Sequence, residues 1–178
     1  MTGVTHAAIG AMAGAALGRL TGAHDVSLAL FGAAGALLPD LDQPGSKAWR
    51  QLLPLATAAV GAQYLGVQLP RPVLAATLAA AALLLLGLAT GHRGATHSLL
   101  ALAGSGALFL ATGSGLQGAA TWAGMATHLL ADLLTPEGVP VFWPAQSRQS
   151  LAVARTGGLV DLLLGAGSLA ATAALLIR

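Results

Sequence analysis

Long runs without charge dominate this chain and limit the folds open to it. Residues 72–91 form a run of 20 residues without a charged side chain, and residues 98–127 form a second run of 30. About 20 apolar helical residues cross a hydrocarbon core of about 30 Å. Only 8% of the residues are charged, against about 25% in ordinary soluble domains. The sequence therefore predicts a single all-α domain over residues 1–178, built as a polytopic bundle of transmembrane helices.

Turn residues divide this apolar sequence into about seven helices. The expected segments are residues 6–20, 26–39, 51–70, 72–91, two helices within 98–127, and 162–177. Residues 98–127 are too long for one span, and Gly113-Ser114-Gly115 predicts a turn that splits them into a hairpin. The first two segments are short, so we expect either two short spans or a re-entrant pair packed against the other helices.

The ionisable residues are concentrated at one set of helix ends. The chain has five histidines and six acidic residues. If the helices alternate in direction, nine of these eleven lie on the same membrane face. The nine are His6, Asp40, Asp42, His92, His97, His128, Asp132, Glu137 and Asp161. Ionisable groups are costly near hydrocarbon and usually lie there for a functional reason. His24 and Asp25 fall on the opposite face, where we expect an ordinary exposed turn.

The basic residues suggest an orientation and argue against nucleic acid as a partner. Five lie on the polar face and three on the other, so the positive-inside rule places the polar face in the cytoplasm. The net charge of +2 comes from scattered residues, and aromatic residues make up only 4% of the chain. Residues 1–6 lack the basic start of a secretory signal, so we expect the first apolar segment to be retained.

His128 and Asp132 give the clearest local signal for a metal site. Positions i and i+4 share one helix face, so an imidazole and a carboxylate could reach one ion together. The alternative is a simple hydrogen bond on the helix surface. Asp40 and Asp132 also lie at helix C-terminal ends, where the helix dipole disfavours a carboxylate by about 0.3–1 kcal/mol. A bound cation would reverse that sign, although Asp40 and Asp42 could equally belong to a solvated turn.

Residues 92–97 place two histidines on one tight turn. His92 and His97 could converge on a metal, with Arg93 free to hold an anionic substrate. The alternative is a pair of interfacial histidines that stabilise helix ends. Thr96 and Ser98 are expected to cap the following helix. The chain has no cysteine, so any metal must be held by histidines and carboxylates. Such ligands fit zinc, manganese or iron, in a one-metal or two-metal site that generates hydroxide from bound water.

These residues resemble the YdjM-type membrane-bound metal-dependent hydrolases. The resemblance spans nearly the whole chain and lies in His6 with Gly10, Leu38-Pro39-Asp40-Leu41-Asp42, residues 92–98, residues 127–135, and the loop from Gly138 to Trp143-Pro144. The family commonly has an acidic residue, often glutamate, just inside its last helix, where this chain has Asp161. The family is similar in its helices and its His-x-x-x-Asp pattern to zinc-dependent phospholipase C. The resemblance thus implies zinc as cofactor and a phosphoester substrate, either a small molecule or a lipid, at the surface of the inner or plasma membrane.

The sequence thus predicts a multi-pass membrane hydrolase with a cytoplasm-facing metal centre. The expected metal ligands are His6, Asp40, His92, His97, His128 and Asp132. Asp42 or Asp161 would be an additional ligand, a ligand-orienting group or a general base, and Arg93 would hold the negative charge of the substrate. Two alternatives remain open at this point: a transporter of metal ions or protons, and a non-catalytic membrane scaffold whose polar residues only cap helices.

Overall fold

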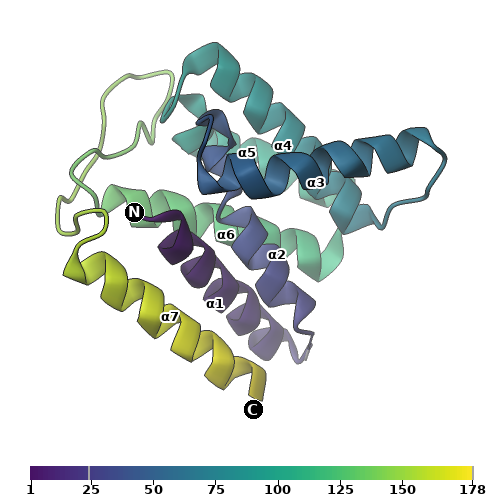
Figure 1. Ribbon diagram of the computed structural model, residues 1–178, viewed down its shortest axis with the longest axis horizontal. Coiled ribbons are helices and arrows are strands. Elements are labelled where there is room, and N and C mark those ends of the chain that lie inside the picture. Colours follow the sequence, from purple (N-terminus) through teal and green to yellow (C-terminus); the bar gives the residue numbers. More distant parts are fainter. Residues whose placement is uncertain (24, 178) are drawn as a thin grey trace.

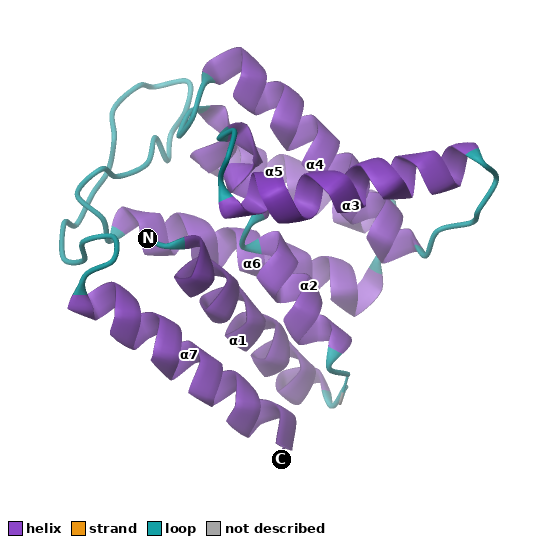
Figure 2. Ribbon diagram, in the orientation of Figure 1, coloured by secondary structure: helices purple, strands orange, loops and turns teal. Residues whose placement is uncertain are grey.

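The computed structural model describes residues 1–23 and 25–177, where helices joined by loops form the fold, with a long loop between residues 133 and 159 (Figure 2). His24, predicted above in an exposed turn, lies outside the described residues. The elements are α1 (Gly3–Thr21), α2 (Ser27–Gly35), the 3₁₀ turn η1 (Leu38–Asp42), α3 (Lys47–Tyr64), α4 (Arg71–Thr90), the 3₁₀ turn η2 (Ala95–His97), α5 (Leu99–Ala111), α6 (Gly115–Leu133) and α7 (Leu159–Ile177). β-type pairing within the described residues is limited to an isolated bridge between Val139 and Gln149.

Helix α1 packs against α2, α6 and α7, and α2 also packs against α6 (Figure 1). Glycines allow these backbones to approach closely. A Cβ atom added to Gly124 of α6 would collide with the carbonyl oxygen of Gly32 and lie 2.8 Å from the backbone nitrogen of Ala36. A Cβ atom on Gly14 of α1 would collide with the carbonyl oxygen of Leu28. Small residues at helix contacts are the usual route to tight packing in lipid, as the glycine content predicted.

A second group of helices holds η1 in place. Leu38 and Leu41 of η1 are buried with Leu83 of α4 and Met125 of α6 in one hydrophobic cluster. In a turn of about three residues, the side chains between these two leucines point the other way. Burial of the leucines therefore directs Asp40 away from this cluster, and Asp42, at the end of η1, contacts the turn at residues 92–97 through His92 and Thr96. Helix α3 extends away from this core, with α3 and α4 joined at its far end (Figure 1).

Two helices, α4 and α7, are long and apolar enough to cross a membrane, judged over the described residues. Only 33% of the α4 window and 22% of the α7 window is buried within the protein, so both helices direct most of their apolar surface outward. Helix α5 is apolar but has only 13 residues. An exposed apolar helix face is typical of contact with lipid.

The predicted division into helices agrees with the structure in number and order but not at every boundary. The predicted segment 51–70 is observed as α3 at Lys47–Tyr64, and α6 extends beyond residue 127 to Leu133. The prediction of about seven helices is confirmed for the described residues, and α4 coincides with the predicted segment 72–91 to within a residue. The hairpin turn falls at the predicted glycines, between α5 and α6. The segment 26–39 is less regular than expected, because α2 ends at Gly35 and Leu38 already belongs to η1. Pro39 occupies the first turn of η1 and has no backbone N–H to extend α2.

Candidate metal centre

Four side chains from three separate elements meet at one point, and we call them the quartet: Asp40, His97, His128 and Asp132. Asp40 comes from η1, His97 from η2, and His128 and Asp132 from successive turns of α6. The Nε2 atoms of His97 and His128 are 3.1 Å apart. Asp40 Oδ1 lies 3.5 Å from the first of these nitrogens and 3.6 Å from the second. Asp132 Oδ2 lies 3.8 Å and 3.6 Å from the same two atoms.

The separations among His97, His128 and Asp40 are close to those of ligand atoms around one small cation. Tetrahedral ligands at about 2.0–2.2 Å from zinc lie about 3.3–3.6 Å from one another. The His97, His128 and Asp40 atoms also belong to a group of donor atoms that all lie within 4.8 Å of one another. Both histidines are fully buried, and Asp132 is 1% exposed. His6, His128 and Asp132 form a second such group, which shares His128 with the first. The quartet is therefore a set of nitrogen and oxygen donors that is largely buried, with the side chain of Asp40 19% exposed.

Hydrogen bonds fix which nitrogen of each histidine is free. The Nδ1–H of His128 donates to the carbonyl oxygen of Ala36 at 2.7 Å, and a carbonyl can only accept. Thr96 Oγ1–H donates to Asp42 Oδ2, so this hydroxyl accepts from the Nδ1–H of His97 at 2.9 Å. Both hydrogens are thus on Nδ1, and the two Nε2 lone pairs of the neutral rings point at each other. Two acceptors at 3.1 Å repel each other unless a cation or a proton lies between them.

When no metal is bound, His97 carries that proton, because two carboxylates lie beside its ring. Burial alone would lower the pKa of His97, but hydrogen bonds and charge from Asp40 and Asp42 outweigh burial and raise it to about 9. At neutral pH His97 is then an imidazolium, whose Nε2–H can donate to His128. A divalent cation would replace this proton. The residues therefore fit a metal ion with histidine and carboxylate ligands.

Asp42 organises the turn at residues 92–97. Its Oδ1 accepts a hydrogen bond of 2.7 Å from His92 Nδ1–H, and its Oδ2 accepts from the backbone N–H of Arg93 and from Thr96. Burial alone would raise the pKa of Asp42, but the hydrogen bonds from His92, His97 and Thr96 hold it far below its usual value. Arg93 adopts a φ of 54°, which is uncommon for a residue with a side chain. The carboxylate thus stabilises an unusual backbone that directs the two histidines.

The predicted ligands His6 and His92 both lie beside the quartet, His6 against His128 and His92 against His97. His6 stacks on His128 with ring centroids 3.9 Å apart, and its Nε2 lies 3.2 Å from Asp132 Oδ1. That carboxylate oxygen also accepts from the backbone amine of Met1 at 2.8 Å. His6 Nδ1 is buried without a hydrogen-bond partner among the described residues. His92 is different, because 36% of its side chain is exposed, and it forms a further group of possible donors with Asp40 and Asp42.

Arg93 lies closer to the carboxylates than the sequence predicted. Its Nη2 lies 3.0 Å from Asp132 Oδ2, and its Nη1 donates to the carbonyl oxygen of Gly138 at 3.2 Å. Glu137 lies 3.9 Å from the same guanidinium and is 57% exposed, as expected for a loop residue. Arg93 was predicted to be free for an anionic substrate. In this structure its guanidinium neutralises Asp132, and its role toward a substrate stays a prediction.

Asp161 lies beside the centre and outside the groups of possible donors in the described residues. Its Oδ2 accepts from the backbone N–H groups of Thr2 at 3.1 Å and Gly157 at 2.7 Å. Its Oδ1 is buried without a hydrogen-bond partner among the described residues. Asp161 thus joins the starts of α1 and α7, and its predicted catalytic role stays a prediction.

Sequence reasoning overlooked Thr96 and the carbonyl of Ala36 as functional groups. Thr96 was predicted as a cap of the next helix, but Ser98 alone accepts from a backbone N–H of α5, that of Ala101. The Thr-His-Ser order was a usable signal for Thr96, because a hydroxyl next to a ligating histidine is well placed to fix its tautomer. A backbone carbonyl leaves no such mark in the sequence.

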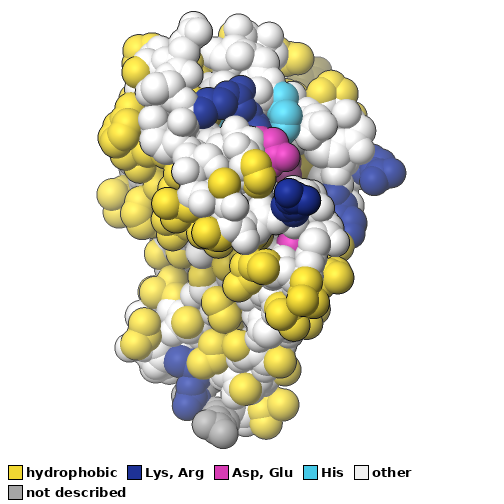
Figure 3. Space-filling model, turned by 90° about the vertical axis from the view of Figure 1, so that its left-hand side faces the viewer, with side chains coloured by type: hydrophobic (Ala, Val, Ile, Leu, Met, Phe, Trp, Pro, Cys, Tyr) yellow, Lys and Arg dark blue, Asp and Glu magenta, His cyan; other side chains and the backbone are white. Residues whose placement is uncertain are grey.

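The centre opens to the surface on one side. Figure 3 shows histidine and acidic side chains at the surface next to Lys and Arg side chains, with hydrophobic side chains over much of the remaining face. His92 and Glu137 are the site residues with substantial exposure. A solvent-exposed mouth bordered by positive charge suits an anionic ligand.

Comparison with known proteins gives a consistent result over the whole chain. The family model described as "YdjM inner membrane protein" matches residues 1–177. The inner membrane protein YdjM of Escherichia coli (strain K12) is 42% identical over 73 residues, which cover 36% of this chain and 36% of that protein. The chain thus aligns with only about a third of that relative's length. The uncharacterized protein YvsG of Bacillus subtilis (strain 168) is 28% identical over 172 residues, covering 94% of this chain and 89% of that protein. No solved structure matches.

Proposed function

We propose that this chain, which belongs to the YdjM family of inner membrane proteins, is a membrane-bound hydrolase that uses a divalent metal ion to cleave a phosphoester. The observation that carries the proposal is the 3.1 Å approach of two buried Nε2 atoms, with Asp40 Oδ1 at 3.5 Å from one and 3.6 Å from the other. Together with Asp40 and Asp132, these nitrogens would hold the ion. Zinc suits a small nitrogen and oxygen site of this kind best, with manganese and iron as the other choices.

The metal ion, when bound, supplies Lewis-acid polarisation of a phosphoryl oxygen and lowers the pKa of a water molecule. The protein positions the groups around it. Thr96 and the Ala36 carbonyl orient the rings of His97 and His128. His6 packs on His128 and is itself buried. These contacts make the ligand geometry part of the fold, which is the arrangement that metal hydrolases need.

We assign proton transfer to His92 at the mouth of the centre. Its Nδ1–H is held by Asp42 at 2.7 Å, so its Nε2 can accept a proton in the neutral ring, and the side chain is partly exposed. A carboxylate that orients a histidine in this way stabilises its protonated form during the reaction. Asp42, predicted as a catalytic group, would then act through His92. Arg93 would turn toward the negative charge of the substrate once a metal ion neutralises Asp132.

The substrate class follows from the charge of the mouth and from the membrane. A phosphoester carries the negative charge that Arg93 and the neighbouring basic residues favour. A site at helix ends can reach a lipid headgroup or a small molecule at the membrane surface. We further propose a polytopic arrangement with the centre on the cytoplasmic side, as the distribution of Lys and Arg residues favours.

The two alternative functions, a transporter of metal ions or protons and a non-catalytic scaffold, fit these contacts less well. Transporters commonly place their coupling residues near the bilayer midplane on interrupted helices. Here Asp40 and His97 belong to short turns, and Asp132 lies at the end of α6. A scaffold would require polar groups that satisfy one another, whereas His6 Nδ1 and Asp161 Oδ1 are buried without a hydrogen-bond partner among the described residues.

Metal content of the purified protein is the first test. The wild type and the Asp132→Asn variant are purified in detergent, exposed to zinc, desalted and analysed for bound metal. The wild type should retain zinc, and Asp132→Asn, which keeps the volume of the side chain, should lose it. Asp25→Asn is the matched control, because Asp25 contacts Ser27 and Gln117 far from the centre. Hydrolysis of bis(p-nitrophenyl) phosphate and of phospholipid vesicles should follow the metal content. Equal zinc in all three proteins, or zinc without hydrolysis of any phosphoester, would count against the proposal.

A further inference from the structure

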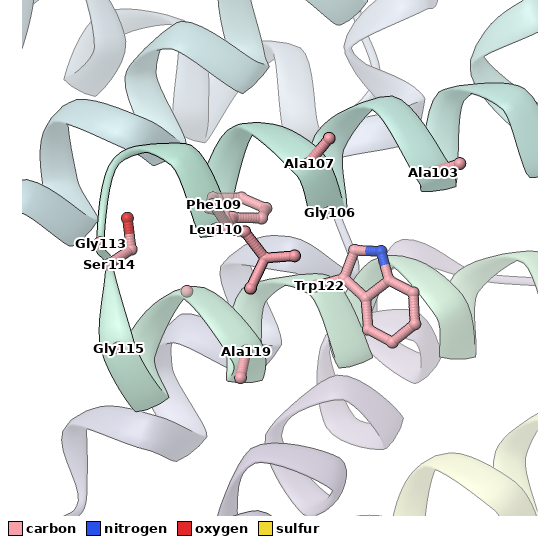
Figure 4. A pocket seen from close by; sticks show the side chains of 11 residues that line it. Ala103, Gly106, Ala107, Phe109, Leu110, Gly113, Ser114, Gly115, Ala119 and Trp122 are labelled. Atoms are coloured by element: carbon pink, nitrogen blue, oxygen red, sulfur yellow. The ribbon is translucent and has the colours of Figure 1, made fainter.

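A second site lies between α5 and α6, away from the metal centre. A groove of about 570 Å³ separates the two helices, within the range of small-molecule sites of about 300–1,000 Å³ (Figure 4). Small apolar side chains line it, including Ala103, Ala107 and Ala119, and Leu110 points into the gap between the helices. Trp122 borders the groove opposite the hairpin turn, and its Nε1–H donates to the carbonyl oxygen of Leu102 at 2.8 Å. The tryptophan ring is therefore held in place as a wall.

The groove ends at the hairpin turn, next to the guanidinium of Arg71. Arg71 Nη1 lies 3.5 Å from the position that a Cβ atom of Gly113 would occupy. Arg71 is exposed and has no ion-pair partner among residues 1–23 and 25–177. An unpaired guanidinium beside an apolar groove favours a ligand with a negatively charged head and an apolar tail.

Helix α4 places this end of the groove on the membrane face opposite the metal centre. Arg71 is the first residue of α4, and His92 follows shortly after its last. A helix of 20 residues is about 30 Å long, which equals the thickness of the hydrocarbon core. Arg71 therefore lies at one bilayer surface and the metal centre at the other. The groove is separate from the proposed active site and does not depend on it.

We propose that this groove binds one acyl chain of a bilayer phospholipid, whose phosphate is held by Arg71. On each wall the groove extends over eight residues of helix, from Ala103 to Leu110 and from Gly115 to Trp122, or about 10 Å. This is less than a single leaflet of about 15 Å, so the groove accepts the part of the chain nearest the headgroup. The phosphate of such a lipid lies at the bilayer surface, where Arg71 is.

A second copy of the protein is a poorer occupant. It would bury Arg71 and would need to offer a carboxylate at this face. Five of the six acidic residues lie at the metal-centre end of the chain. The sixth, Asp25, already accepts hydrogen bonds from Ser27 and Gln117. The bilayer, in contrast, supplies a phosphate and an acyl chain together.

Binding of dioleoyl phosphatidylglycerol to the detergent-purified protein tests this proposal. Native mass spectrometry measures the stoichiometry, and quenching of Trp122 fluorescence by a brominated form of the same lipid measures the location. The quenching experiment uses a Trp49→Phe/Trp143→Phe background so that only Trp122 emits. Dioleoylglycerol, which lacks the phosphate, and inorganic phosphate, which lacks the chains, separate the two parts of the ligand.

Two variants and two matched controls complete the design. Arg71→Gln should weaken phosphatidylglycerol binding by about tenfold, as expected for a lost hydrogen bond to a charged group, and leave dioleoylglycerol binding unchanged. Ala107→Phe should fill the groove and abolish binding and quenching by both lipids. Arg19→Gln, at the end of α1, and Ala170→Phe, on the exposed face of α7, should behave like the wild type. All four positions are exposed, so the variants should fold.

Several outcomes would overturn the proposal. Equal affinity for phosphatidylglycerol and dioleoylglycerol would show that Arg71 does not bind the phosphate. Equal losses of phosphatidylglycerol binding in Arg71→Gln and Arg19→Gln would show that the lipid responds to surface charge in general and not to Arg71. A dimer in native mass spectra that dissociates in Ala107→Phe would show that a second copy, and not a lipid, occupies the groove.

Discussion

Substitution of Gly124 by alanine should disturb the metal centre from one helical turn away. The added Cβ atom would lie 2.8 Å from the backbone nitrogen of Ala36, and ordinary contact begins at 3.4 Å. Helix α6 must therefore move away from Ala36 by about 0.6 Å, and by more where the same atom collides with the Gly32 carbonyl. The hydrogen bond from His128 to the Ala36 carbonyl, now 2.7 Å, would lengthen to about 3.3 Å or beyond.

Two effects of this substitution can be separated by magnitude. Replacing a helical glycine by alanine favours the helix by about 1 kcal/mol, and this gain is common to any helical glycine. Overpacking costs about 1–3 kcal/mol, and the upper end applies because the collision is with backbone atoms. Gly104→Ala on α5 is the control, since nothing lies within 4 Å of its added Cβ atom. The two variants should therefore differ by about 3 kcal/mol, or roughly 6–12 °C in Tm.

The measurement combines thermal unfolding in detergent with a zinc titration against a competing chelator. Loss of an orienting hydrogen bond to a ligating histidine typically weakens metal affinity by about 10–100-fold. Gly124→Ala should show this loss and a lower Tm, and Gly104→Ala should show neither. If Gly124→Ala keeps wild-type zinc affinity, then the Ala36 carbonyl does not position His128, and the reasoning about its tautomer is wrong.

Three further outcomes follow from the same contacts. Thr96→Val should lower zinc affinity by about 10–100-fold, because His97 loses its hydrogen-bond acceptor, whereas Thr96→Ser should keep it; equal affinities in a chelator titration would contradict this. His92→Gln should leave bound zinc unchanged but lower kcat by about 10²–10⁴-fold if His92 transfers the proton, and loss of zinc would instead make it a ligand. The Tm of the metal-free protein should fall as the pH rises from 6.5 to about 9, because the folded state raises the pKa of His97 across that range. The protonated ring stabilises the fold fully below pH 6.5, so a flat profile, or the same decline in His97→Gln, would refute the assignment.

The sequence predicted the helices and the gathering of the polar residues well. The charge-free run at 72–91 could form little except a long apolar helix, and the glycines at 113 and 115 could form little except a turn. The alternation of the helices then required His6, Asp40, His97 and Asp132 to approach one another. These inferences rest on hydropathy and chain direction, which are properties of the sequence itself.

The details of the centre could not be predicted in the same way. Arg93 was placed toward a substrate, yet its guanidinium lies 3.0 Å from Asp132, because a buried carboxylate attracts a nearby cation. Asp161 was grouped with the other acids, but its Oδ2 satisfies the backbone N–H groups of Thr2 and Gly157. Both outcomes depend on side-chain directions and on backbone groups, and neither is encoded by residue spacing.

The order in which the chain is synthesised limits when the metal centre can form. The carbonyl of Ala36 and the ring that it orients, His128, are separated by 92 residues. At about 5–20 residues per second, α6 leaves the ribosome on the order of 10 s after α2. Asp40 must spend that interval without His128 of α6, and Asp42 must wait for its partners in residues 92–97. The nascent chain therefore holds an incomplete, negatively charged half-site, and metal loading is a late event that follows the arrival of the sixth helix.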